Sequence, residues 1–265
     1  MRNTTNGAQS VRRAIALLKA FDRGTPELGV TQLAARVGLH KATVHRLAAT
    51  LVAERFLRQD PVTGRYALGS ELYRIAQLFL EQDPLLREGR EVLLSLRNAC
   101  GHTVSLGVLD GEAVLFLLVL EGTLPVRINV AAPGERAPLW STATGKVLLA
   151  SLPPAERAAH LPADPLPSLT PRTLTSRAAV LAEVEEVARQ GLGWSREEHT
   201  LGVISLAAPA RIGRETVALA VSCPTNLVGP GDLAVLGEQV RAAACALAAR
   251  FGNESELCPG EERRA

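Results

Sequence analysis

The amino-acid sequence predicts an α+β protein in two parts: an N-terminal winged helix-turn-helix with a linker helix, and a larger domain with a sheet and flanking helices. Two patterns predict the first part. A short helix, a glycine turn and a longer helix cover residues 31–53, and two extended segments joined by proline and glycine cover residues 55–68. The third observation is charge: residues 1–70 have a net charge of +7, whereas residues 71–265 have a net charge of −5. This asymmetry favours phosphate binding by the first part only.

The first part is expected to contain three helices and a hairpin. Ser10 is expected to cap a helix that ends at Phe21, after a frayed polar segment. Thr31 is expected to cap a second helix, which Gly38 ends because glycine accepts the left-handed conformation of a helix C-cap. The expected divisions of the chain are residues 10–68 for the winged helix-turn-helix, 69–83 for the linker helix, 84–251 for the second domain and 252–265 for a disordered tail.

The second part alternates helical and extended patterns. Its helices are expected at residues 85–99, 144–151, 177–190 and 232–251. Its strands are expected at residues 103–109, 113–121, 125–131, 193–195, 203–209 and 216–222. The Asp110-Gly111 pair between the first two strands favours a hairpin, so an antiparallel sheet is the expected framework.

The third helix, over residues 41–53, has one apolar side and one small, polar and basic side. Alanines on the second side allow close approach to base edges, and cations and backbone amides near the helix start suit phosphates. Arginines on the hairpin can contact the DNA backbone or the minor groove. The predicted DNA-binding residues are therefore Lys41, Ala42, Thr43, His45, Arg46, Ala49, Arg58 and Arg65. The alternative is a solvated surface helix in a three-helix core.

The sequence resembles the IclR family of bacterial regulators over residues 10–250. The resemblance rests on LAARVGLHKATVHRLAATLVAERFLRQDPVTGRYALG in the first part, and on GERAPLWSTATGKVLLASL, GLGWSREEHTLGVISLAAPA and TVALAVS in the second. It implies a winged helix-turn-helix, a linker helix that helps dimerisation, and an effector domain of GAF-like or profilin-like type. It also implies a homodimer or homotetramer on a palindromic operator in double-stranded DNA.

The resemblance also implies where a small-molecule effector binds. The positions that match the family pocket are Ala143, Thr144, Ser195, Ser205, Ala220 and Ser222. Several family members carry Asp, Cys and Ser where this chain has Ser195, Ser205 and Ala220. A frequent histidine is Trp140 here, and a frequent polar pair is Leu118 and Val119. These differences predict a more apolar pocket, which disfavours a short hydrophilic keto acid as effector.

The segment Ala143–Val147, ATGKV, resembles a phosphate loop only in part. A Walker A loop needs another glycine five positions before the glycine of the Gly-Lys pair and Ser or Thr after the lysine, and Trp140 and Val147 stand there instead. Two interpretations stay open for this segment: a helix N-terminus whose amides receive a carboxylate with help from Thr144, or an N-cap formed by Thr142 or Thr144. Trp140 is expected in the core or an interface.

The sequence favours a ligand-responsive, DNA-binding transcriptional regulator over an enzyme. No nucleophile–base pair or metal-ligand spacing is recognisable, so no catalytic residue, metal or cofactor is expected. Glu197, Glu198 and His199 resemble an acid–base cluster, but a solvated loop is the expected structure. The alternatives are a small-molecule-metabolising enzyme with an accessory helical domain, and a protein-interaction module. Without a signal peptide or a long apolar segment in the sequence, the expected location is the cytoplasm, with no membrane contact.

Overall fold

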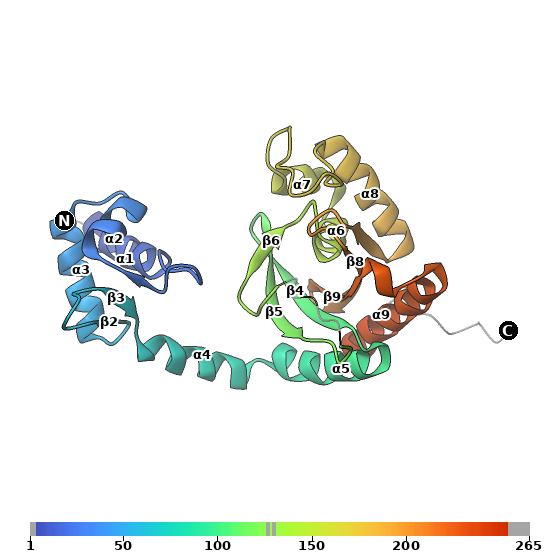
Figure 1. Ribbon diagram of the computed structural model, residues 1–265, viewed down its shortest axis with the longest axis horizontal. Coiled ribbons are helices and arrows are strands. Elements are labelled where there is room, and N and C mark those ends of the chain that lie inside the picture. Colours follow the sequence, from blue (N-terminus) through green and yellow to red (C-terminus); the bar gives the residue numbers. More distant parts are fainter. Residues whose placement is uncertain (1–3, 126–127, 129–130, 254–265) are drawn as a thin grey trace. The chain divides into compact units, whose positions relative to one another are not determined.

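The structure is a computed structural model, and it describes residues 4–125, 128 and 131–253. The chain divides into two compact units, an N-terminal unit of Met1–Asp83 and a C-terminal unit of Pro84–Ala265 (Figure 1). Within the described residues, no helix combines the length and the apolar character needed to cross a membrane.

The N-terminal unit packs three helices against a small antiparallel sheet. The helices are α1 (Thr4–Leu18), α2 (Val30–Val37) and α3 (Lys41–Ala53), and the strands are β1 (Glu27–Leu28), β2 (Leu57–Gln59) and β3 (Tyr66–Leu68). The sheet order is β1-β3-β2, so the predicted hairpin is present and β1 extends it. Leu17, Leu33, Val44 and Tyr66 are buried together in one core.

Three local expectations for this unit are wrong. The helix α1 spans Thr4–Leu18, so it includes part of the expected frayed segment and ends before Phe21. The N-cap of α2 is Gly29 rather than Thr31, and the Gly29 amide donates to the Gln32 side chain at 3.0 Å. Residues 23–29, which contain Gly and Pro and were expected to form a loop, include β1, because hydrogen bonds to β3 supply a partner that local sequence does not reveal.

The helix α4 (Ser70–Gln82) follows the small sheet and buries none of its residues. Large apolar side chains that are exposed along it are Tyr73, Ile75, Leu78, Phe79 and Leu80. An exposed apolar surface of this kind is characteristic of a helix that packs against a partner.

The C-terminal unit is built on a six-stranded antiparallel sheet in the order β6-β5-β4-β9-β8-β7. The strands are β4 (Thr103–Asp110), β5 (Ala113–Leu120), β6 (Arg136–Pro138), β7 (Gly193–Arg196), β8 (Val203–Ile212) and β9 (Glu215–Pro224). Five of these match predicted strands. The expected strand over residues 125–131 lies largely outside the described residues, and β6 was not predicted.

Helices cover both faces of this sheet (Figure 1). On one face lie α5 (Pro84–Cys100) and α9 (Pro230–Arg250), and on the other lie α6 (Ala143–Ala150), α7 (Pro154–Arg157) and α8 (Arg177–Gln190). Two short 3₁₀ helices span Ala158–His160 and Thr225–Leu227. The predicted helices at 85–99, 144–151, 177–190 and 232–251 are confirmed to within two residues.

Small residues on the sheet allow α6 to approach closely. Along β9 the side chains alternate, so that Leu219 packs toward α5 and α9 while Ala218 and Ala220 pack toward α6. A Cβ atom on Gly193 would lie 2.8 Å from the Ala143 carbonyl oxygen, and one on Gly107 would lie 2.8 Å from a Thr144 carbon. The start of α6 is therefore held against the sheet, where it forms one wall of a pocket.

Candidate nucleic-acid interface and candidate ligand pocket

The helix α3 presents the predicted polar side to solvent. Val44 and Ala48 are completely buried, because the apolar side of α3 packs against α1 and α2. Of the predicted DNA-binding residues on α3, Thr43 is half-buried and the exposed ones are Lys41, Ala42, His45, Arg46 and Ala49. Neither Lys41 nor Arg46 forms an ion pair with another described residue, so both charges are available to a phosphate.

The two predicted arginines of the wing, the β2–β3 hairpin, have different environments. The Arg58 side chain is 65% exposed and lies 3.5 Å from the Glu27 carboxylate. The Arg65 guanidinium instead donates to the Glu27 carbonyl oxygen at 2.8 Å and is half-buried. Arg65 therefore joins the wing to β1, a structural role that the sequence pattern did not reveal.

The wing ends in a turn that is closed by Asp60. The Asp60 carboxylate accepts the amides of Val62 and Thr63 at 2.8 and 2.7 Å, and the Gly64 amide donates to the Asp60 carbonyl oxygen at 2.9 Å. The amides of Thr63 and Val62 hold the pKa of Asp60 below its ordinary value. Val62 is 91% exposed at this turn and is not among the residues predicted to bind DNA.

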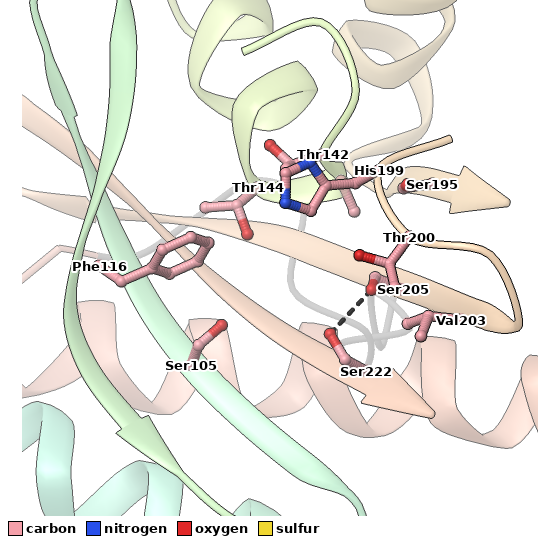
Figure 2. A pocket seen from close by; sticks show the side chains of 11 residues that line it. Ser105, Phe116, Thr142, Thr144, Ser195, His199, Thr200, Val203, Ser205 and Ser222 are labelled. Carbon is pink, nitrogen blue, oxygen red and sulfur yellow. Dashed lines mark hydrogen bonds between the residues drawn. The ribbon is translucent and has the colours of Figure 1, made fainter. Parts of the chain in front are cut away.

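A small pocket lies between α6 and the sheet in the C-terminal unit (Figure 2). Its cavity volume is about 30 Å³. The residues that line it are Ser105, Phe116, Thr142, Ala143, Thr144, Ser195, His199, Thr200, Val203, Ser205 and Ser222. The structure thus brings together five of the six predicted effector residues. The sixth, Ala220, is 2% exposed, packs in the core on the α6 side and does not line the pocket.

The start of α6 separates the roles of two neighbouring threonines. The Thr142 hydroxyl accepts the Gly145 amide at 3.0 Å and donates to the Pro138 carbonyl oxygen at 2.9 Å, so Thr142 is the N-cap. Thr144 lies one residue inside the helix, with its methyl group over Gly107 and its hydroxyl toward the cavity (Figure 2). Of the two interpretations that the sequence left open, the N-cap is Thr142, while Thr144 lines the cavity.

Most of the side chains that line the pocket are polar but uncharged. Eight of the eleven lining side chains carry a hydroxyl or an imidazole, and none carries a carboxylate, an ammonium or a guanidinium group. Leu118 and Val119 do not line it, and Trp140 lies in the core, where its indole donates to the Pro167 carbonyl oxygen at 3.2 Å. The prediction of a pocket more apolar than in other family members stays a prediction; Ser105, on the neighbouring strand β4, adds a hydroxyl that was not among the predicted residues.

Several of these polar side chains have hydrogen-bond partners beside the cavity. The Ser195 hydroxyl donates to the Ser141 carbonyl oxygen at 2.8 Å, and the Ser205 and Ser222 hydroxyls lie 2.8 Å apart (Figure 2). The His199 Nδ1 atom lies 3.2 Å from the Ser141 hydroxyl, and burial lowers the pKa of His199. The imidazole is therefore held neutral beside the cavity.

A buried ion cluster lies behind the pocket wall. The Lys146 side chain is completely buried, and its ammonium donates to both Glu198 carboxylate oxygens at 2.8 and 2.7 Å and to Glu183. Glu198 is 6% exposed, so the expectation of a solvated loop at Glu198 is wrong. Burial raises the pKa of Glu198, and Lys146 opposes this rise. Lys146 therefore neutralises carboxylates and does not face a phosphate.

Comparison with known proteins identifies the family of the chain. The sequence model of the bacterial transcriptional regulator IclR C-terminal domain matches residues 77–249, and that of the IclR helix-turn-helix domain matches residues 10–61. This chain belongs to the IclR family. It is therefore a DNA-binding transcriptional regulator and not an enzyme, so the enzyme alternative is rejected.

Individual relatives agree with the assignment of this regulator to the IclR family. It is 33% identical over 246 residues to the HTH-type transcriptional regulator XynR of Escherichia coli, covering 92% of this chain and 97% of XynR. It is 34% identical to the glycerol operon regulatory protein of Streptomyces griseus, covering 84% of this chain and 87% of that protein. A solved structure assigned to the IclR regulators, from Silicibacter sp. TM1040, is 32% identical with a TM-score of 0.84, covering 95% of this chain and all of that chain.

Proposed function

We propose that this IclR regulator is controlled by a small organic effector that binds in the pocket between α6 and the sheet. The observation that carries the proposal is the assembly of Ala143, Thr144, Ser195, Ser205 and Ser222 around one cavity, although they come from separate segments. The effector shifts DNA binding only to the extent that its affinity differs between the two states of the regulator.

The pocket chemistry supports a small carboxylate or an aromatic metabolite as effector. The Thr144 hydroxyl and the amides at the start of α6 suit a carboxylate, and the Phe116 ring supplies an apolar surface (Figure 2). A cavity of about 30 Å³ holds roughly one or two water molecules. Binding of an organic acid therefore requires the cavity to enlarge.

On the DNA side, the proposed phosphate contacts are Lys41, Thr43, Arg46 and Arg58, and the proposed base contacts are Ala42, His45, Arg46 and Ala49. Arg65, which the sequence also suggested, is proposed to hold the wing in place through Glu27. The exposed apolar side chains of α4 support a homodimer or homotetramer, which would bind a palindromic operator in the cytoplasm.

A thermal-shift experiment tests the effector site. The probe is 4-hydroxybenzoate, which carries both a ring and a carboxylate and which is bound to an IclR homologue of Microbacterium hydrocarbonoxydans that is 23% identical to this chain. It is compared with a panel of small aliphatic and aromatic carboxylates. At least one of them is expected to raise the unfolding midpoint with increasing concentration.

Thr144→Val and Thr225→Val are the matched variants for this experiment. Thr144→Val keeps the shape of the side chain and removes the hydroxyl, so it should lower the affinity for the stabilising ligand about tenfold. Thr225 lies outside the pocket, and its substitution should leave the ligand affinity unchanged. Absence of stabilisation by every carboxylate, or an equal effect of both variants, would contradict the proposed site.

A further inference from the structure

The tip of the wing exposes an apolar side chain between the two arginines, Arg58 and Arg65, that were predicted to bind DNA. Val62 is 91% exposed, the highest value among the exposed large hydrophobic residues of the described chain. The five residues of the turn, Asp60–Gly64, include no lysine or arginine. The neighbouring Arg65 donates to the Glu27 carbonyl oxygen and so points away from the tip, toward β1.

The turn that carries Val62 is rigid before any partner binds. Both the Val62 and the Thr63 amides donate to the Asp60 carboxylate, and the Gln59 side chain donates to the Gly64 carbonyl oxygen at 3.0 Å. Pro61 further restricts the backbone on the other side of Val62. Both amides donate to the same oxygen, Oδ1, of Asp60, which is the one acidic residue in the turn. A preorganised turn loses little conformational entropy when its tip binds.

We propose that Val62 is a DNA-contacting residue that packs against the sugar and base-edge surface of the minor groove next to the segment occupied by α3. Apolar side chains in wings and loops bind there because the walls of the minor groove are formed largely by deoxyribose. The contact adds affinity without neutralising a phosphate, so it contributes a part of DNA binding that salt does not weaken. This inference rests on DNA binding through α3.

Duplex binding by Val62→Ala tests the proposal, with the full-length protein and a duplex from the region upstream of its own gene. The substitution should lower the affinity about three- to tenfold. The slope of log affinity against log salt concentration should stay unchanged, since no charge is removed. Val235→Ala is the matched control, because Val235 is a valine that is 58% exposed on α9 in the C-terminal unit. It should bind DNA as the unsubstituted protein does.

A minor-groove ligand, netropsin, locates the contact. Netropsin on the duplex should lower the DNA affinity of the unsubstituted protein more than it lowers the DNA affinity of the Val62→Ala variant. Equal affinities of the two proteins without netropsin, or equal weakening of both by netropsin, would overturn the proposal. Failure of the unsubstituted protein to bind any duplex would instead contradict DNA binding itself, so the two failures are distinguishable.

Discussion

Replacing Lys146 with methionine should destabilise the C-terminal unit by about 3–4 kcal/mol at pH 7. The substitution removes the partner of Glu198, which is 6% exposed and cannot be solvated where it lies. The least costly response is protonation of Glu198. Its ordinary pKa is 4.5, which is 2.5 units below pH 7, and each unit costs about 1.4 kcal/mol. This value agrees with the roughly 3–5 kcal/mol found when one partner of a buried ion pair is removed.

The destabilisation by Lys146→Met should depend on pH through the titration of Glu198. A carboxyl group whose pKa is raised on folding contributes stability below its unfolded pKa, and that contribution is lost as the pH rises through the folded pKa. Glu198 already has a raised pKa, and loss of Lys146 raises it further. The destabilisation by Lys146→Met should therefore fall to about 1 kcal/mol at pH 5, where protonation of Glu198 is nearly free.

Urea unfolding followed by tryptophan fluorescence measures this effect. Trp140 and Trp194 are the two tryptophans of the chain, and both lie in the C-terminal unit, so the signal follows that unit. The double variant Lys146→Met/Glu198→Gln removes both charges and should recover much of the lost stability at pH 7. Arg214→Met, at an exposed cation of the same unit, should change stability by less than about 0.5 kcal/mol.

Two results would refute the reasoning about Lys146. One is an equal destabilisation of Lys146→Met at pH 5 and pH 7, which would mean that Glu198 does not titrate in response. The other is a double variant as unstable as the single one, which would place the loss in packing rather than in an unpaired carboxylate. Glu183 is 48% exposed and returns to water when Lys146 is removed, so it should contribute little in either case.

Two further predictions concern the DNA-binding face and the pocket wall. Arg46→Ala should weaken duplex binding and reduce the slope of log affinity against log salt concentration by about 0.9 per protomer, as one lost phosphate contact requires. Arg214→Ala is the control and should change neither the affinity nor the slope. An unchanged slope for Arg46→Ala would show that Arg46 makes no phosphate contact. Gly145→Ala should destabilise the C-terminal unit by more than about 2 kcal/mol in urea unfolding, because its Cβ would lie 2.4 Å from the Leu139 carbonyl oxygen. A Cβ atom on Gly231 of α9 would have no atom within 4 Å, so Gly231→Ala is the control. If it lowered stability as much as Gly145→Ala, the contact with the Leu139 carbonyl oxygen would not be the cause.

Features that depend on neighbours along the chain could be predicted from the sequence. The helix α3 has its predicted bounds, Lys41–Ala53, because the alternation of apolar and polar residues marks its buried side. Gly38 adopts the predicted left-handed conformation, with φ of 65°, at the end of α2. The hairpin around Asp60 and Gly64 follows from the same kind of local preference. The sequence also determined the charge difference between the two units and the family of the chain.

Features that depend on contacts between distant segments were decided only by the tertiary structure. The sequence alone suggests that Glu198 lies in a solvated loop, whereas the fold brings it to Lys146, 52 residues earlier in the chain. The sequence alone suggests that Arg65 contacts DNA, whereas in the structure β1 places the Glu27 carbonyl oxygen beside its guanidinium. The hydroxyl of Ser105 lines the pocket because β4 pairs with β9, which places Ser105 opposite Ala220, two residues from Ser222. Periodicity in a sequence specifies which side of an element is buried, but the atom that meets each buried polar group is fixed by how the elements pack.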